Sequence, residues 1–260
     1  MSTERKDDVD ELYRAASNVS IAATTAFVIS IVCSIIMLIN SEGVFGRIIK
    51  ITAIISTIAY VILANLHDML FFYRAESERR KVLISNALGI EASSSETNLY
   101  YNNPEEQSVV RLGVNSYESA FFTKKIIAKM LISRGVGGLA VIGLYIALLL
   151  LSSNLDVIVL VTQTLFSGEI LIGIIKLIFY YFKLNAVLKE FYGILIKSRV
   201  SSRKELDALL LDAVMDYECL KSYCQIAISS RVFGKYNVQW SKEWKKLYQK
   251  IRKAANKSQP

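Results

Sequence analysis

The chain has 260 residues, of which 53% are hydrophobic and 21% are charged, and it contains only two prolines. This composition favours a helical protein whose apolar residues are concentrated in blocks. Three cysteines and a single histidine form no metal-ligand pattern, and no disulfide is expected, so we predict neither a metal nor a cofactor.

The first predicted membrane span comprises residues 21–39, which contain no charged side chain. Because a helix rises about 1.5 Å per residue, a run of this length nearly matches the roughly 30 Å hydrocarbon core of a bilayer. The preceding residues 1–18 are acidic and lack the basic start and the small-residue cleavage site of a signal peptide, so the span is expected to be retained as an anchor. Residues 8–19 are predicted to form a short amphipathic helix before it.

Three further apolar runs are long enough to cross a membrane. The second comprises residues 48–66 and is uncharged from Ile51, the third follows Arg134, and the fourth extends from Val157 to about Phe182. The connections within each pair of spans are short, about eight and five residues, and short connections join antiparallel neighbours. The sequence therefore predicts an all-α membrane protein with four transmembrane helices in two hairpins.

A cytoplasmic helical hairpin is predicted between the two membrane hairpins. The second span continues without proline or glycine until Gly89, which is a suitable C-cap. After a polar loop, Asn103 is predicted to be the N-cap of the next helix, with Pro104 at the first helical position. This helix is expected to end near Arg134 and to pack against the extension of the second span.

A cytoplasmic C-terminal helical tail is predicted after the fourth span. One helix is expected at about residues 202–229, and a last helix is expected to begin at Ser241 and end at about residue 255. The complete prediction divides the chain into an N-terminal helix with the first hairpin, the cytoplasmic hairpin, the second membrane hairpin and the tail: residues 1–66, 67–134, 135–183 and 184–260.

Basic residues set the predicted orientation. Of the 31 Lys and Arg residues, nine lie in residues 67–135 and sixteen follow Lys176, whereas the tip of the second hairpin has none. By the positive-inside rule, both termini and the central hairpin are expected in the cytoplasm. Lysine-rich membrane flanks near anionic lipid headgroups account for the net charge of +8, so no direct nucleic-acid binding is expected.

The fourth predicted span is the most polar of the four. Thr162, Glu169 and Lys176 are spaced by seven residues, which places them near one helical face. Ionisable residues at membrane depth usually face a bundle interior or an aqueous path, so these three are candidates for a pore lining or a subunit contact. The alternative is that they form polar contacts within a single bundle, or that Glu169 is protonated.

The loop between the two cytoplasmic helices contains a candidate ligand site. Two adjacent aromatic side chains, two amides and an arginine near a helix N-terminus are able to stack on and hydrogen-bond a nucleotide-like ligand. The alternative is that the tyrosines only fix the loop to the hairpin. The residues concerned are Tyr100, Tyr101, Asn102, Asn103 and Arg111.

Other short patterns carry less information about function. The segment GVGG at residues 135–138 does not have the spacing of a phosphate-binding loop, and we expect a hinge or close helix packing there. Arg79, Arg80 and Lys81 form either an anion site or a solvated helix face. No nucleophile and base pair stands out, so an enzyme is not expected.

Three stretches prompt a comparison with a known family: ISNALGIEASSSETNLYYNN (84–103), VNSYESAFFTKKI (114–126) and VFGKYNVQWSKEW (232–244). With the two-plus-two arrangement of spans, they resemble the SMODS-associating four-transmembrane effectors, pore formers encoded beside cyclic-oligonucleotide synthases in bacterial anti-phage defence operons. The resemblance implies an inner-membrane homo-oligomer that opens on an infection signal, received as a cyclic oligonucleotide or through an operon-encoded cytoplasmic partner. A non-conducting membrane scaffold that recruits such a partner is the alternative.

Overall fold

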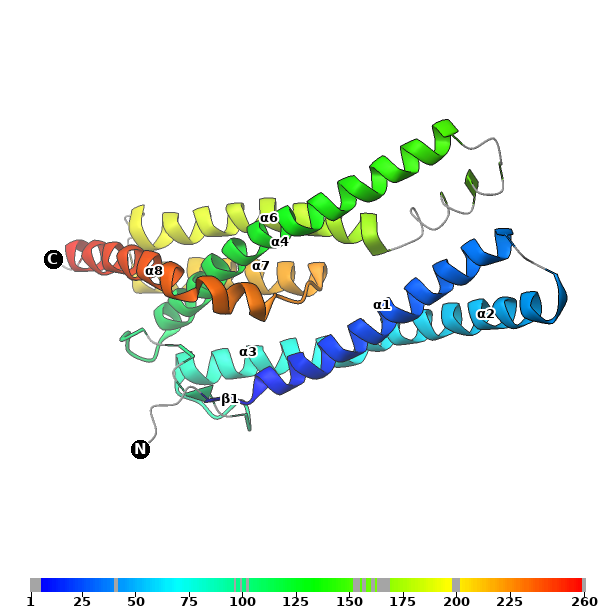
Figure 1. Cartoon of the computed structure of the whole chain (residues 1–260). Helices are drawn as coiled ribbons and strands as arrows, with labels where there is room; N and C mark the ends of the chain where they lie inside the picture. Colours follow the sequence, from blue (N-terminus) through cyan, green and yellow to red (C-terminus); the bar gives the residue numbers. More distant parts are fainter. Residues whose placement is uncertain are drawn as a thin grey trace. The chain divides into compact units, whose positions relative to one another are not determined.

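A computed structural model describes residues 6–39, 42–95, 97–98, 100–101, 103–151, 155, 158–159, 162, 169–197 and 202–258. Apart from the connecting loops and two strands of two residues each, this part of the chain is helical, so the all-α prediction is confirmed in its essentials. Figure 1 shows the elements β1 (Lys6–Asp7), α1 (Val9–Ile39), α2 (Gly43–Leu66), η1 (a π-helix, His67–Phe72), α3 (Tyr73–Leu88), β2 (Thr97–Asn98), α4 (Val109–Leu151), α6 (Glu169–Tyr192), η2 (a π-helix, Gly193–Lys197), α7 (Arg203–Cys224) and α8 (Ser230–Ser258).

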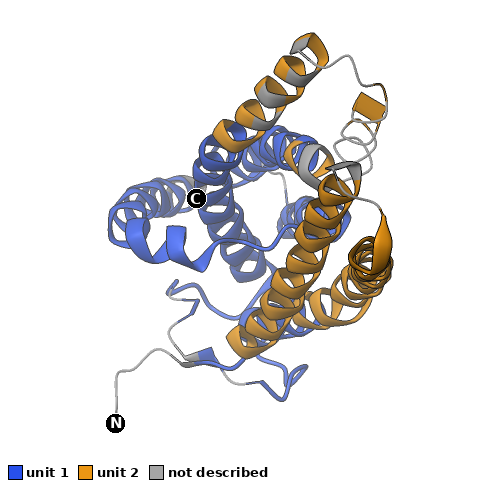
Figure 2. Ribbon diagram, turned by 45° about the vertical axis from the view of Figure 1, so that its right-hand side comes forward, with its two compact units in different colours: residues 1–8, 77–135, 175–260 blue, residues 9–76, 136–174 orange. Residues whose placement is uncertain are grey.

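The chain divides into two compact units, coloured separately in Figure 2. We call residues 9–76 and 136–174 the membrane unit, and residues 1–8, 77–135 and 175–260 the helical head. Helix α1 lies entirely in the membrane unit, whereas α4 and α6 pass from one unit into the other without a break.

Three helices are long and apolar enough to cross a membrane: Val9–Met37, Gly43–Leu88 and Val109–Ala147. Their outward faces carry exposed aliphatic side chains, such as Ile21, Ile55 and Leu139, which are 61%, 61% and 71% exposed. An apolar surface of this extent is stable in hydrocarbon but not in water, so the chain is a membrane protein. Of the fourth predicted span, residues 157–182, the structure describes 158–159, 162 and 169–182.

Two of these helices are much longer than a bilayer is thick. Helix α4 has 43 residues and is therefore about 64 Å long, roughly twice the hydrocarbon core. The uncharged residues 135–151 suffice for the crossing, whereas residues 109–134 carry five basic side chains and one acidic one and extend out of the membrane. The same reasoning assigns residues 51–66 of the second helix to the membrane and leaves α3 outside it.

Within the membrane unit, α1 and α2 lie antiparallel and pack through small and polar side chains. The hydroxyl groups of Ser30 and Thr57 are 2.8 Å apart, and the ring centroids of Phe27 and Tyr60 are separated by 5.0 Å. A small buried cluster of Cys33, Ile49 and Ala53 continues the contact toward the hairpin tip. Residues 9–19, part of the short helix predicted to lead into the first span, are helical and form the start of α1, which is continuous from Val9 to Ile39.

The glycine segment at 135–138 does not interrupt α4, so the predicted hinge is not seen as a break in the helix. The second alternative, close packing, fits Gly138. A Cβ atom at Gly138 would lie 2.4 Å from the Cδ1 atom of Ile174, nearer than real contacts allow. A hydrogen in place of a side chain therefore permits the approach of Ile174 to this helix.

The head is built around a core from five helices. Tyr117 of α4 stacks on Phe191 of α6 at a centroid distance of 5.5 Å and meets Trp244 of α8 edge to face, also at 5.5 Å. Helix α7 approaches α4 closely, because a Cβ atom at Gly113 would lie 2.7 Å from Leu210. Helix α3 adds Leu83 and Ala87 to the same cluster.

Two helix ends in the head agree with the prediction, and three differ. Gly89 ends α3 with a φ of +69°, as predicted. Helix α7 begins close to the predicted position, where the Ser202 hydroxyl accepts a hydrogen bond from the Glu205 amide, but it ends at Cys224 and not near residue 229. The predicted helix start at Asn103 is wrong, because α4 begins at Val109, after Ser108. The predicted start at Ser241 is wrong as well, because α8 is one helix from Ser230.

Both errors have a physical cause. The Asn103 side chain accepts a hydrogen bond from the Glu105 amide in a turn, and the Ser108 hydroxyl instead accepts from the Arg111 amide as a helix cap does. In α8, the Ser241 hydroxyl donates to the side chain of Asn237 one turn earlier, and the helix continues because residues before it are anchored in the core.

Candidate functional site

A buried ion pair joins the N-terminal segment to α3. Both terminal nitrogens of Arg79 donate to the carboxylate of Asp7, at 3.0 and 2.9 Å, and the two side chains are only 9% and 6% exposed. Beside it, Lys6 and Asp7 pair with Asn98 and Thr97 in the two-residue ladder of β1 and β2. A bidentate pair of this kind is charge-assisted and geometrically specific, so it fixes the chain immediately before α1.

Tyr100 and Tyr101 lie in this region of the head. The guanidinium carbon of Arg79 is 4.2 Å from the centroid of the Tyr100 ring, a cation–π contact. The rings of Tyr100 and Tyr101 meet edge to face at 4.7 Å, and burial raises the pKa of Tyr101 well above its usual value. The tyrosines thus pack on Arg79 and on the core of the head, as the second alternative for this loop describes.

Of the residues predicted for ligand binding, Asn103 and Arg111 belong to a hydrogen-bond network between α3 and α4. The Oδ1 atom of Asn86 accepts from Arg111 at 3.3 Å and from Asn115 at 3.0 Å, and Asn103 donates to the Oδ1 atom of Asn115. Arg111 also donates to the carbonyl of Glu105 at 3.0 Å. Asn115 is fully buried, so this network satisfies polar groups inside the head.

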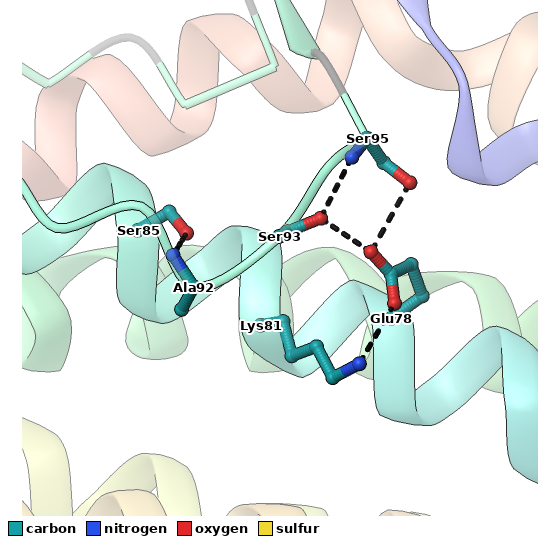
Figure 3. A network of polar contacts seen from close by, with 6 residues as sticks. All are labelled: Glu78, Lys81, Ser85, Ala92, Ser93 and Ser95. Carbon is teal, nitrogen blue, oxygen red and sulfur yellow. Dashed lines mark hydrogen bonds and ion pairs between the residues drawn. The ribbon is translucent and has the colours of Figure 1, made fainter.

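A second network fixes the loop that follows Gly89, as Figure 3 shows. Glu78 of α3 accepts hydrogen bonds from the hydroxyl groups of Ser93 and Ser95 and from Lys81. The bond from Ser93 contributes most to lowering the pKa of the Glu78 carboxyl. Through these bonds the loop is held on α3 just before β2, the strand that pairs with the N-terminal segment.

The structure therefore brings four predicted residues to one end of the head. Tyr100 contacts Arg79, Tyr101 contacts Tyr100, and Asn103 and Arg111 are linked through Asn115 and Asn86. Asn102 lies outside the described residues. Sequence reasoning missed Asp7, Asn86 and Asn115, because nothing in a single sequence signals a contact across 72 positions, as between Asp7 and Arg79.

The residues predicted in the fourth span are only partly described. The Thr162 hydroxyl is 2.7 Å from the Tyr145 hydroxyl and donates to the Ile158 carbonyl at 2.7 Å. Glu169 is the first residue of α6, and its side chain lies outside the described part of the structure. Lys176 is exposed. Thr162 thus makes a polar contact with a neighbouring helix, as the alternative interpretation of these residues describes.

In the part of the chain that the structure describes, no group of three or more His, Cys, Asp or Glu side chains is placed to hold a metal ion. No family model, curated protein or solved structure matches the chain.

Proposed function

We propose that the protein is a membrane effector of bacterial anti-phage immunity that, on an infection signal, oligomerises or opens and permeabilises the inner membrane. The observation that carries the proposal is helix continuity. Residues 43–88 form one helical rod with a π-helical turn at 67–72, and residues 109–151 form a single helix, so two rods lead from the head into the apolar spans. The resemblance to four-transmembrane effectors supports the same conclusion.

Continuous helices transmit movement because a packed helix moves as a unit. A rearrangement at the loop end of the head would shift the N-terminal end of α4 and the C-terminal end of α3, and with them the spans. The ion pair between Asp7 and Arg79 adds a third connection between the head and the spans, since Asp7 precedes α1 by two residues. In this proposal, the network around Asn86 and Arg111 is where a nucleotide or a partner protein acts.

The permeation path is assigned to Thr162, Glu169 and Lys176. A carboxylate near mid-membrane costs about 2.5–3.5 kcal/mol on insertion scales, and this cost is avoided when the group faces water or another subunit. Tyr145 extends the polar surface to the preceding helix through its contact with Thr162. In the proposed topology, the head and both termini lie in the cytoplasm of the inner membrane, and several copies surround the path.

A non-conducting scaffold is the second candidate, and a specific observation favours it. Helix α8 presents eight exposed Lys and Arg side chains, a surface suited to a partner and unnecessary for conduction. In that case the spans serve only as an anchor, and the head recruits a cytoplasmic component.

The decisive experiment measures potassium efflux from vesicles that contain the purified protein, together with membrane potential in cells challenged with phage. Efflux on triggering is expected, and Glu169→Gln is expected to change its rate several-fold. Glu42→Gln, an equal change at the exposed start of α2 and outside the uncharged run, is the matched control and should leave the rate unaltered. Vesicles that remain tight under every condition in which the cells are protected would instead establish the scaffold.

A further inference from the structure

Helix α8 concentrates the positive charge of the molecule. Its 29 residues contain nine Lys and Arg and one acidic residue, so its net charge of +8 equals that of the whole chain. The single acidic side chain, Glu243, is already paired with Lys125 of α4 at 2.6 Å. Eight of the basic side chains are exposed: Arg231, Lys235, Lys242, Lys245, Lys246, Lys250, Arg252 and Lys253.

These cations form one face of the helix. Arg231, Lys235, Lys242, Lys246 and Lys253 follow one another at intervals of four and seven residues, which keeps them on one side of a helix with 3.6 residues per turn. The opposite side carries the buried residues Trp240, Trp244 and Ile251. From residue 231 to residue 253 the cationic face is about 33 Å long. Among the described residues, none of the eight exposed cations forms an ion pair with a carboxylate.

The sequence suggests that basic residues lie beside the membrane, near anionic lipid headgroups. This explanation does not account for the charge of α8. The helix runs antiparallel to the first half of α4, because Tyr236 meets Lys129 whereas Trp244 meets Tyr117 and Tyr248 meets Glu105. As the residue numbers along α8 rise, those of the contacted residues in and before α4 fall. Helix α8 therefore extends away from the residue at which the apolar run of α4 begins.

Distance excludes lipid headgroups for most of this face. Seventeen residues separate Tyr117, opposite Trp244, from Arg134 at the start of the apolar run, which is about 26 Å along the helix. The field of an anionic bilayer decays within a Debye length of about 8–10 Å at physiological salt. Lys245 and the cations after it lie even farther from Arg134, so the headgroups of a bilayer are not their binding partner.

We propose that the cationic face of α8 binds the phosphate backbone of a nucleic acid without reading its sequence. A duplex presents one phosphate per roughly 1.7 Å of its axis, on the order of twenty over the length of this face, and neutralising phosphates releases counterions. Binding driven by counterion release requires Lys and Arg along an extended surface and needs no pocket. The function goes beyond membrane permeabilisation and does not depend on it.

An acidic protein is the less suitable occupant. Protein interfaces rely on a central cluster of buried aromatic or aliphatic anchors. The only large apolar side chain strongly exposed on the described part of α8 is Val238, which is 73% exposed, and the two tryptophans of the helix are buried in the head. Affinity at this surface must therefore be almost entirely electrostatic, as in non-specific nucleic-acid binding.

The test measures fluorescence anisotropy of a labelled 30-base-pair DNA duplex with the full-length protein in nanodiscs of neutral lipid. With five phosphate contacts, the logarithm of the binding constant should fall with log salt at a slope of about −4.5, so affinity should decrease about 500-fold from 50 to 200 mM salt. The triple variant Lys242→Gln, Lys246→Gln and Lys253→Gln should reduce the slope by about 2.7. Arginine at the same three positions keeps the charge and should retain binding.

The matched control removes the same charge elsewhere on the head, by Lys183→Gln, Lys189→Gln and Lys204→Gln, all exposed on α6 and α7. It should leave the slope unchanged. The proposal is overturned if no duplex binds at 50 mM salt, or if the glutamine triple on α8 and the control triple on α6 and α7 lose affinity equally. It is also overturned if polyglutamate or anionic vesicles compete as well as unlabelled DNA. None of these readouts involves ion leakage, so they are independent of the pore.

Discussion

Asp7 and Arg79 show how single residues connect the ends of the head. The pair closes a loop of more than seventy residues around a two-strand ladder that has only two residue pairs. Such a ladder is too short to be stable alone, so the ion pair and the contact of Arg79 with Tyr100 must hold it. The residues that determine whether the N-terminal segment stays on the head are therefore few.

Removal of one partner of this pair leaves a buried charge without compensation. Asp7→Asn should therefore cost about 3–5 kcal/mol locally and release β1 from β2. Hydrogen exchange of residues 6–8 and 97–98 measures the release, with the amides of α7 as internal reference. In the double variant with Arg79→Gln part of the loss should be recovered, because the orphan charge is gone. Unchanged exchange in Asp7→Asn would contradict the role of the pair.

Glu118 of α4 makes the head sensitive to pH. Burial raises the pKa of its carboxyl to about 7, against a lowering by the hydrogen bond from Trp244. Since the folded protein then binds the proton more tightly than the unfolded chain does, stability falls as pH rises from about 4.5 to about 7 and is level above that. The size is up to about 3 kcal/mol, and less if water reaches the half-buried side chain.

Thermal unfolding followed by tryptophan fluorescence tests this directly, because both tryptophans, Trp240 and Trp244, lie in α8 of the head. Glu118→Gln should raise the midpoint at pH 8 and leave it nearly unaltered at pH 4.5. Glu243→Gln, a half-exposed carboxyl of the same region, is the control. Equal midpoint differences at both pH values would show that the charge of Glu118 has no part in the effect.

At the scale of elements, predictions from uncharged length succeeded, whereas local cap chemistry gave the right helix end at Gly89 and wrong helix starts at Asn103 and Ser241, where long-range contacts decide. The apolar runs at 21–39 and 51–66 and the caps at Gly89 and Ser202 depend on neighbouring residues alone, so one sequence suffices for them. The start of α4 depends on Asn103 being engaged by Asn115, and the start of α8 depends on anchoring in the core of the head. Such contacts leave no local pattern.

Gly89 tests the junction between α3 and the loop. A side chain there would adopt an unfavourable positive φ, and its Cβ atom would lie 2.2 Å from the side chain of Gln107. Gly89→Ala should destabilise the head by about 1–2 kcal/mol. Gly234 lies in the first turns of α8, and a Cβ atom added there would have no atom within 4 Å. Gly234→Ala should instead stabilise the head by up to about 1 kcal/mol. Opposite shifts of the thermal midpoint are the expected result.

At the scale of the whole molecule, charge separates the units. The head carries a net charge of +11 and the membrane unit −3, and these sum to the +8 of the chain. Basic segments resist transfer across a membrane, so the head, with α8 and the N-terminal part of α4, should remain on the cytoplasmic side.

The native cysteines allow this topology to be measured with little alteration. Cys219 is exposed on α7, whereas Cys33 and Cys224 are buried, so a membrane-impermeant thiol reagent should label Cys219 alone. Labelling is expected in inverted inner-membrane vesicles and not in intact spheroplasts. Glu42→Cys in a Cys219→Ser background places the thiol at the exposed start of α2. It should reverse the pattern, because in the proposed topology the first hairpin turns on the outer side. Labelling of Cys219 in spheroplasts would place the head outside the cell and would remove a cytoplasmic signal or nucleic acid as its partner.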